Sequence, residues 1–449
     1  MEFLTGKKLI DKTKLFGIVS KVGDAQRRSS ARALRCDRGR EGLLELAYKH
    51  ADRIHVRIPH ILNASNIVDT VPDCMPLPDE HESTTYSVTH ADYTPDSWVS
   101  LANARKTFDS ALGGPEGFDK WLRDSLMINP SEAYGTHNTL HKIWRKFLTT
   151  FQVARGLIFY RPLWIEYIRK FFVTFIDDGA SYLEPRIPFY HKMMHDADGH
   201  LTVPHREWML DFECVMNEVK EELKAQGRED DFVGARVIYT SLRNVSPEDL
   251  QWYMDDCIAL KQEFPHLIAA FNKRVKSLGL DLPLILHAGE TCSDGGKADV
   301  NLYDAILLGT KRIGHGYSIV KHPKLMQICR ENGILLEVCP ISNEVLRLTS
   351  SMPTHHLPIM LSQGVPIALC PDDPSVFGSM GLSYDFFQVL VASELTGIIT
   401  LAEIARDSLT YSTLEPAEKD RALAIWGKRW AKFVDEIVAL DRTGDGLQN

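Results

Sequence analysis

Three short motifs place side chains that bind metals or transfer protons directly after apolar segments. LILHAGET carries His287 and Glu290, RIGHGY carries His315, and IALCPDDP carries the adjacent Asp372 and Asp373. Zinc takes imidazole and carboxylate ligands at about 2.0–2.2 Å, and a catalytic zinc site keeps one position for water. Because zinc lowers the pKa of that water to roughly 7, this set of side chains indicates metal-assisted hydrolysis.

Each motif alone also has a purely structural interpretation. A lone histidine at a strand end is more often a hydrogen-bonded structural residue, and Asp-Asp-Pro alone usually marks a turn with a helix N-cap. Three such motifs in chain order favour one shared site. Two other pairs, His137/His141 and His191/His195, have the i,i+4 spacing of helical zinc sites. Neither pair carries the Glu of H-E-x-x-H, so we expect both to be structural.

The elements that must position the three motifs alternate along the chain from Tyr182 onward. Short apolar or β-branched runs are separated by amphipathic helical stretches, which predicts a parallel sheet with crossover helices. Seven candidate strands appear, one fewer than a (β/α)8 TIM-type barrel needs: YLEPRI, RVIYT, IAAF, LILHAGE, RIGHG, LLEVCPIS and IALCPDD. The carboxyl ends of barrel strands meet at one face. We therefore expect the side chains of all three motifs to surround one pocket.

The preceding part of the chain has a different pattern. Residues 43–179 are mainly helical in pattern, with a loop rich in Pro, Asp, Glu and His at Val71–Ser97 and two helices, divided at a proline, over Leu140–Ile176. We predict an N-terminal helical region over residues 1–180. A metal-dependent hydrolase barrel is predicted over residues 181–449.

Composition and charge narrow the classes of partner. The chain has 449 residues, and 51 Lys and Arg against 60 Asp and Glu give a net charge of −9, which argues against nucleic-acid or anionic membrane partners. Eight cysteines occur without a C-x-x-C pair, so we expect isolated buried thiols. No apolar run reaches the roughly 20 residues of a membrane span, and Met1–Ile10 lacks the apolar centre of a signal peptide. As written, the chain is expected to be cytoplasmic; an upstream signal segment would make it secreted.

The motifs resemble those of the adenosine deaminase family. The resemblance rests on HAGET, RIGHGY, EVCPISNEVL, CPDDPSVFGSMGLSYDF and WGKRWAKFV, and it runs from about Trp144 to Phe433. It is greatest for the branch of adenosine-deaminase-related growth factors, also called adenosine deaminase 2-like proteins. The resemblance implies a (β/α)8 barrel that binds one zinc ion and converts adenosine, a small purine nucleoside, to inosine and ammonia. A homodimer is compatible with it.

The resemblance also implies a role for each residue of the motifs. His287 and Asp372 would be zinc ligands, and Glu290 would protonate the purine N1. His315 would orient or deprotonate the zinc-bound water, and Asp373 would hydrogen-bond the purine N7. The resemblance also places Trp144 where this branch has an aromatic residue in the substrate pocket. The residue types agree with these roles, because attack at C6 of a purine places charge on N1, which a neighbouring acid stabilises.

One motif of the family is missing. Its first barrel strand resembles MPKGALLHAH, whose two histidines are zinc ligands, but this chain has Asp24–Arg40 (DAQRRSSARALRCDRGR) there, with six Arg that no buried strand can carry. Back-translated with permissible codons and read one nucleotide later, this stretch encodes MPKGAPPHAHFDATVDA. We infer an out-of-frame translation that returns to frame by Leu43. With His287 and Asp372 alone, we expect weak zinc binding unless a residue such as His55 or His60 replaces the lost ligands.

A second departure affects the fourth barrel strand. Residues 266–283 stand in place of a longer family segment resembling GFDLVGxE, so the strand survives only as Ile268–Phe271. Two damaged strands would leave the barrel without pairing partners at its seam.

The sequence therefore predicts a zinc-dependent adenosine deaminase-like aminohydrolase whose activity is impaired in the chain as written. Two alternatives stay open. One is a barrel deaminase that acts on another purine. The other is a non-catalytic, growth-factor-like binding protein, which the missing His-x-His favours and the presence of all five motif residues disfavours.

Overall fold

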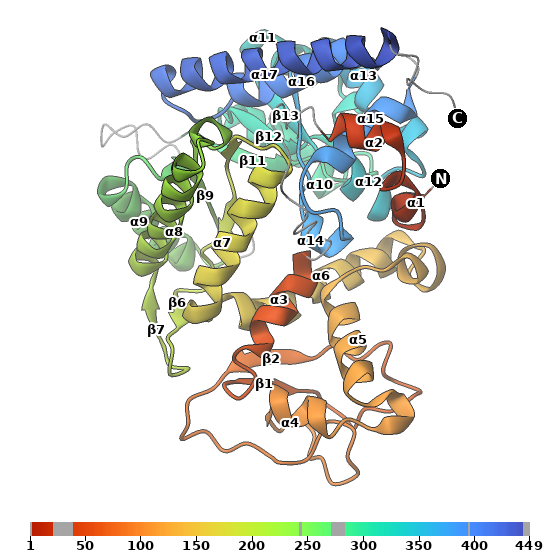
Figure 1. The fold of residues 1–449 in the computed structure, drawn as a ribbon, viewed down its shortest axis with the longest axis vertical. Helices are drawn as coiled ribbons and strands as arrows, with labels where there is room; N and C mark the ends of the chain where they lie inside the picture. Colours follow the sequence, from red (N-terminus) through yellow and green to blue (C-terminus); the bar gives the residue numbers. More distant parts are fainter. Residues whose placement is uncertain (1, 21–38, 242–244, 271–282, 394–395, 443–449) are drawn as a thin grey trace.

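The computed structural model of the chain describes residues 2–20, 39–241, 245–270, 283–393 and 396–442 (Figure 1). The inferred out-of-frame stretch Asp24–Arg40 lies outside the described residues, except for its last two positions. Those two positions belong to the first turn of helix α3 (Gly39–Tyr48). Leu43 of this helix is fully buried, which agrees with a sequence that is in frame from there onward.

All seven strands predicted after Tyr182 form, and each pairs in parallel with its sheet neighbours. The first predicted run is divided into two short strands, β4 (Tyr182–Leu183) and β5 (Arg186–Pro188). The second run, RVIYT, forms β9 (Val237–Thr240), and a further short strand, β8 (Gly234–Ala235), lies just before it. The other five are β10 (Ile268–Ala270), β11 (Ile285–Ala288), β12 (Arg312–His315), β13 (Leu335–Val338) and β14 (Ile367–Leu369). The alternation of apolar runs and amphipathic stretches therefore identified the strands correctly.

Within the described residues these strands form two main parallel sheets. One has the order β10-β9-β5 and the other β11-β12-β13-β14, and β4 pairs with β8 separately. β10 and β11 are edge strands, and no backbone pairing joins them in the described part of the chain. Ile238, Ala269 and Ile285 form a small buried cluster that spans the two sheets. The fold is thus mixed α/β with parallel strands. β10, which was expected as the fourth strand of the barrel, is short, as predicted, and Phe271 lies outside the described residues.

Helices connect and cover the strands. They are α8 (His205–Ala225), α9 (Pro247–Glu263), α10 (Lys297–Leu307), α11 (Pro323–Asn332), α12 (Pro340–Val345), α13 (Leu357–Ser362), α14 (Pro374–Phe377), α15 (Ser383–Ala392), α16 (Ile398–Thr410) and α17 (Pro416–Arg442). Several of them begin with proline in the first turn, where its missing N–H has no intrahelical partner to lose. None of the described helices has the length and apolar character needed to cross a membrane.

The N-terminal region contains strands as well as helices. Its helices are α3, α4 (Leu101–Lys106), α5 (Gly114–Leu126), α6 (Leu140–Ile158) and α7 (Arg161–Asp177), and the last two confirm the predicted pair. An antiparallel sheet β2-β1-β3, from β1 (Ile54–Arg57), β2 (Asp73–Pro76) and β3 (Val99–Ser100), was not predicted. A hairpin of β6 (Met193–His195) and β7 (Leu201–Pro204) was also missed. Strands of two to four residues are too short to show an alternating pattern.

The first described helices dock on the four-stranded half of the molecule. α1 (Phe3–Ile10) and α2 (Lys14–Val19) lie beside α12 and α15 in Figure 1. The Phe3 amide donates to Glu344 Oε1 at 3.0 Å, and the Tyr384 hydroxyl donates to Asp11 at 2.6 Å. Phe3 is completely buried. Residues before and after the predicted boundary at 180 share this core, and the division itself stays a prediction.

Candidate active site

The polar motifs lie at the carboxyl ends of neighbouring strands, as predicted. His315 is the last residue of β12, and Asp372 follows β14. Both have a left-handed backbone, with φ of 66° for His315 and 56° for Asp372. Non-glycine residues rarely adopt this conformation, and such strain concentrates at functional sites. The chain therefore holds these two side chains at a backbone cost, which is expected where their direction matters.

Glu290, His315 and Asp372 converge. His315 Nε2 lies 3.4 Å from Glu290 Oε1 and 4.0 Å from Asp372 Oδ2. The rings of His287 and His315 have centroids 5.3 Å apart and are inclined by 41°. Asp373 is adjacent in sequence and occupies the N-cap position of α14, where its side chain makes no capping hydrogen bond. The structure thus brings four of the motif residues together and places the fifth next to them.

A glycine on the neighbouring strand makes room for the His287 ring. Gly314 of β12 is the register partner of His287 in β11. A Cβ at Gly314 would lie 3.2 Å from both Cγ and Cδ2 of His287, and 3.4 Å from Arg186 Nη2. The close approach of the ring to the backbone therefore depends on the absence of a side chain at position 314.

Helix α12 positions the Asp372 side chain through a hydrogen bond. The Ser342 hydroxyl donates to Asp372 Oδ2 at 2.6 Å. The amide of Ile341 donates to Asp385 Oδ1 at 3.2 Å. All six residues of α12 are buried, so its position is fixed by packing. Sequence reasoning missed this support because Ser342 and Asp385 belong to segments that only the fold brings together.

Burial sets the protonation of the site. His315 is 3% exposed, and this burial lowers the pKa of its imidazole, an effect that the neighbouring Asp372 partly opposes. Burial also raises the pKa of the Cys339 thiol well above its usual value. The imidazole and the thiol are therefore both neutral at pH 7 unless a cation is bound.

An ion network lies within the sheets, on strands that carry the site. Arg312 Nε donates to Glu337 Oε1 at 2.8 Å, and Arg186 Nη2 donates to Glu337 Oε2 at 2.5 Å. Burial alone would raise the pKa of Glu337, but Arg186 and Arg312 lower it to about 2. Because Arg186 is on β5 and Glu337 on β13, this pair joins the two parallel sheets.

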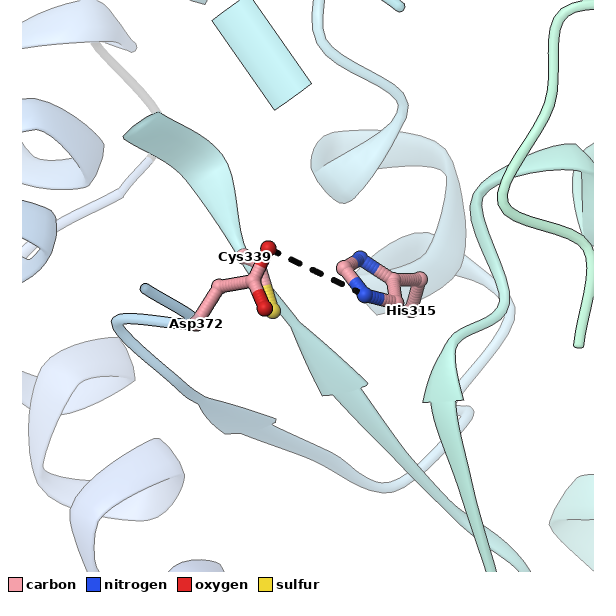
Figure 2. A group of neighbouring side chains, drawn as sticks. All are labelled: His315, Cys339 and Asp372. Carbon is pink, nitrogen blue, oxygen red and sulfur yellow. Dashed lines mark ion pairs between the residues drawn. The ribbon is translucent and has the colours of Figure 1, made fainter. Parts of the chain in front are cut away.

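Cys339, expected to be an isolated buried thiol, also lies beside the site. His315, Cys339 and Asp372 have potential ligand atoms within 4.8 Å of one another (Figure 2). His287 does not belong to this group. The signal that could have identified Cys339 is its position: it directly follows β13, and His287, His315 and Asp372 also lie at or just after the carboxyl ends of their strands. The remaining described cysteines form no disulfide, and three of them are buried, Cys74, Cys257 and Cys329.

The other candidates lie apart from this group. Trp144 on α6 is half-buried and packs edge-to-face on Phe147, which stacks on Phe377 of α14. It is therefore linked to the helix after Asp373 through one intervening ring, and its place in a substrate pocket stays a prediction. His55 belongs to β1, at the opposite end of the molecule from β12 and β13 (Figure 1), and His60 bonds Thr70.

Three of the four histidines in the two i,i+4 pairs have local contacts. His137 contacts the Thr136 hydroxyl at 3.0 Å, and His195 contacts the Gly199 carbonyl at 2.8 Å. His191 packs its ring on Phe159 at a centroid distance of 4.7 Å. These contacts support the structural interpretation of both pairs.

Comparisons with known proteins identify the family of the chain. The family model of adenosine deaminase matches residues 129–425. The chain belongs to the adenosine deaminase family. It is therefore an aminohydrolase, as the motifs predicted.

Adenosine deaminase 2-A of Danio rerio is 33% identical over 362 residues, 76% of this chain and 69% of that protein. Adenosine deaminase 2 of Homo sapiens is 31% identical over 365 residues, 76% of this chain and 68% of that protein. These relatives confirm the predicted adenosine deaminase 2-like branch.

Solved structures support the fold. A crystal structure of an amidohydrolase from Burkholderia ambifaria, described with bound zinc, is 17% identical, covers 66% of this chain and 80% of its own, and has a TM-score of 0.52. The Arabidopsis ADAL protein in complex with IMP is also 17% identical, covers 68% of this chain and 87% of its own, and has a TM-score of 0.50. At these identities the likeness concerns the fold alone.

Proposed function

We propose that this chain catalyses the metal-assisted hydrolytic deamination of adenosine to inosine and ammonia. The observation that carries the proposal is the convergence of Glu290, His315 and Asp372 at the carboxyl ends of parallel strands, with 3.4 Å and 4.0 Å between the imidazole and the two carboxylates. The family to which the chain belongs, and relatives that are named adenosine deaminases, support this substrate.

The donor set suits a zinc ion. Carboxylate and imidazole groups lie together in a buried site, and Ser342 orients one carboxylate as the outer partners of metal ligands do. His287 and Asp372 are the side chains that would hold the ion. When bound, it would lower the pKa of water and so make a hydroxide nucleophile available at neutral pH.

The chain's own residues would handle the protons and the ring. Addition of water oxygen to C6 of the purine places negative charge on N1, and Glu290 would donate a proton there. His315 would accept the proton that the attacking water loses. Asp373 would bond N7, which is an acceptor, so its carboxyl must carry a proton to donate. His315 would then return its proton to the amino nitrogen, so that the bond from C6 to this nitrogen breaks and ammonia leaves, and the proton of the added hydroxyl would pass to Glu290 and restore its carboxyl group.

The proposal also covers the barrel architecture and the effect of the missing His-x-His motif on turnover. We infer that the two parallel sheets are parts of one (β/α)8 barrel, which the Arg186–Glu337 pair and the shared cluster at Ile285 support. We further propose that turnover in the chain as written is lowered, because no His-x-His sequence occurs in it.

The test compares four purified proteins in the presence of zinc, by the loss of adenosine absorbance. They are the chain as written, a version with MPKGAPPHAHFDATVDA in place of residues 24–40, that version with Glu290→Gln, and that version with Glu263→Gln as a control at an exposed carboxylate on α9. The restored version should be faster than the original by orders of magnitude, because metal assistance contributes several kcal/mol and each 1.36 kcal/mol is about tenfold in rate.

Each comparison can fail separately. Glu290→Gln should lower turnover by about 10²–10⁴-fold, the usual contribution of a general acid, while Glu263→Gln should leave it unchanged. Equal rates for the original and restored chains would contradict the proposed impairment but not the reaction. A restored, folded and zinc-loaded protein that turns over no adenosine would contradict the proposed function.

A further inference from the structure

Four adjacent parallel strands each present one metal-binding side chain at the same edge. His287 lies on β11, His315 ends β12, Cys339 follows β13 and Asp372 follows β14. Parallel pairing in register brings these ends together, since Val338 pairs with Leu369 and His287 with Gly314. The proposed function uses three of these four side chains. Cys339 has no part in it.

We propose that Cys339 is the third protein ligand of the metal ion, beside His287 and Asp372. The inference rests on the proposed function insofar as the ion is the same one. Catalytic zinc sites usually have three protein ligands, and thiolate sulfur is among the groups that zinc takes. A third ligand from β13 would make up part of the loss of the two first-strand histidines.

The geometry of the described residues supports this assignment. The sulfur of Cys339 lies within 4.8 Å of potential ligand atoms of both His315 and Asp372 (Figure 2). Ligands at about 2.0–2.3 Å around one tetrahedral ion lie about 3.3–3.8 Å from one another. The ligand atoms must therefore move closer to one another by about 1 Å when an ion binds, and rotation of the side chains can supply this movement. An ion bound to Asp372 would therefore have the sulfur within reach.

Two atoms of the site, the Cys339 sulfur and His315 Nδ1, are weakly bound or unbound by other groups in the described part of the chain. Cys339 is 4% exposed, and its sulfur makes a weak hydrogen bond to the Glu337 carbonyl at 3.5 Å. In the described part of the chain, His315 Nδ1 is buried without a hydrogen-bond partner. A buried polar atom left in this way usually points to a ligand or a water molecule.

Binding through sulfur has a defined proton balance. The S–H bond of Cys339 breaks, the sulfur–metal bond forms, and the proton passes to solvent. A thiolate among the ligands would also favour zinc or cadmium over magnesium or calcium, because soft ligands select soft metals.

The decisive measurement uses the unmodified chain. X-ray absorption at the zinc edge should show a sulfur neighbour at about 2.3 Å, in addition to nitrogen and oxygen at about 2.0–2.2 Å. Zinc surrounded by nitrogen and oxygen alone would overturn the inference. Because this experiment needs no variant, it does not depend on whether a substituted protein folds.

Variants then identify which sulfur is bound. With cadmium, the chain should show an ultraviolet charge-transfer band from thiolate to metal, which Cys339→Ser should remove and the control Cys292→Ser, at an exposed cysteine near Glu290, should retain. Cys339→Ser should also weaken zinc binding by more than the roughly 10–100-fold that loss of an outer partner costs. A band that persists in Cys339→Ser overturns the inference, whereas the proposed reaction is judged separately by adenosine turnover.

Discussion

The two parallel sheets of this protein have the same kind of strand pairing but differ in the side chains at their carboxyl ends. In β10-β9-β5 the strands end at Ala270, Thr240 and Pro188, and Phe189 stacks on Tyr239 with centroids 4.4 Å apart. Near the carboxyl end of each strand of β11-β12-β13-β14 lies a side chain that can bind a metal or carry a proton: His287 within β11, His315 at the end of β12, Cys339 after β13 and Asp372 after β14. Among the described residues, the chemistry thus lies in one sheet, and the other contributes packing.

The difference between the two sheets shows that parallel pairing alone does not make an active site; the residues at the strand ends must also have suitable side chains. Parallel strands bring their carboxyl ends together whatever residues stand there. The chemistry comes from a few positions that the four-stranded half provides by itself. The three-stranded half is connected to it by a small number of side chains, so the two halves should respond differently to substitution.

The largest expected effect is on the connection between the halves. Arg186→Met removes one of two arginines from the buried Glu337 carboxylate, whose side chain is 11% exposed. Removing one partner of a buried ion pair costs about 3–5 kcal/mol, because the other charge stays buried. We expect a loss of about 3 kcal/mol in the free energy of unfolding, measured by urea denaturation.

A surface arginine provides the matched control. Arg169 also faces two carboxylates, Glu218 and Glu222, but all three side chains are well exposed. Arg169→Met should cost less than about 1 kcal/mol. If Arg186→Met is no more destabilising than Arg169→Met, the connection between the halves is not made by this ion pair.

The four-stranded half was largely predictable from the sequence. Its strands are continuous apolar runs that directly precede His287, His315 and Asp372, so the order of the motifs and the rule for parallel strands placed the site. The rest depended on contacts between distant segments. Asp385 bonds an amide 44 residues away, and no local pattern encodes this. Cys339 is free and buried, as expected, but its position beside His315 and Asp372 was not predicted, because a lone cysteine is most often a buried apolar residue.

The N-terminal region was less predictable for a different reason. β1 to β3 have two to four residues each and pair antiparallel across long loops. β2 lies within the stretch that was predicted as a loop, because its Asp, Cys, Met and Pro carry no strand pattern. Such strands exist through tertiary packing, which a single sequence does not show.

The next effect concerns the orientation of Asp372. Ser342→Ala removes the 2.6 Å hydrogen bond to Oδ2 and leaves the rest of α12 in place. Loss of an outer partner of a metal ligand typically costs 10–100-fold in metal affinity. We expect zinc affinity, measured by competition with a chelator, to fall by about this factor. Ser362→Ala, at an exposed serine of α13, should leave it unchanged; equal affinities in the two variants would show that Ser342 does not position the ligand.

Lowering the pH is expected to have a smaller effect, on the free energy of unfolding. His355 is buried, accepts from the Leu357 amide at Nδ1 and donates from Nε2 to Asn343 of α12, and burial lowers its pKa to about 3. The unfolded chain takes up a proton below pH 6.5 and the folded chain does not until about pH 3, so stability falls as pH drops through this range. At pH 5 this amounts to about 2 kcal/mol.

Substitution isolates this contribution. His355→Gln removes the titrating group, so the change in the free energy of unfolding between pH 7 and pH 5 should become smaller by about 2 kcal/mol. The measurement is urea denaturation of both proteins at each pH. An identical dependence on pH in the two proteins would contradict the assignment to His355.

The smallest effect distinguishes two glycines. An added Cβ at Gly314 lies 3.2 Å from the His287 ring, so the ring must move by a few tenths of an ångström, whereas an added Cβ at Gly17 of α2 meets nothing within 4 Å. Overpacking of this kind costs at least about 1 kcal/mol, while Gly to Ala in an open helical position gains about 0.4–1 kcal/mol. Gly314→Ala should thus destabilise the protein slightly and also weaken zinc binding, because the displaced ring is a proposed ligand. Gly17→Ala should stabilise it without changing zinc binding. Both variants are compared by denaturation curves and chelator competition. If Gly314→Ala binds zinc as the unmodified chain does, zinc binding does not depend on the close approach of the His287 ring to Gly314 of β12.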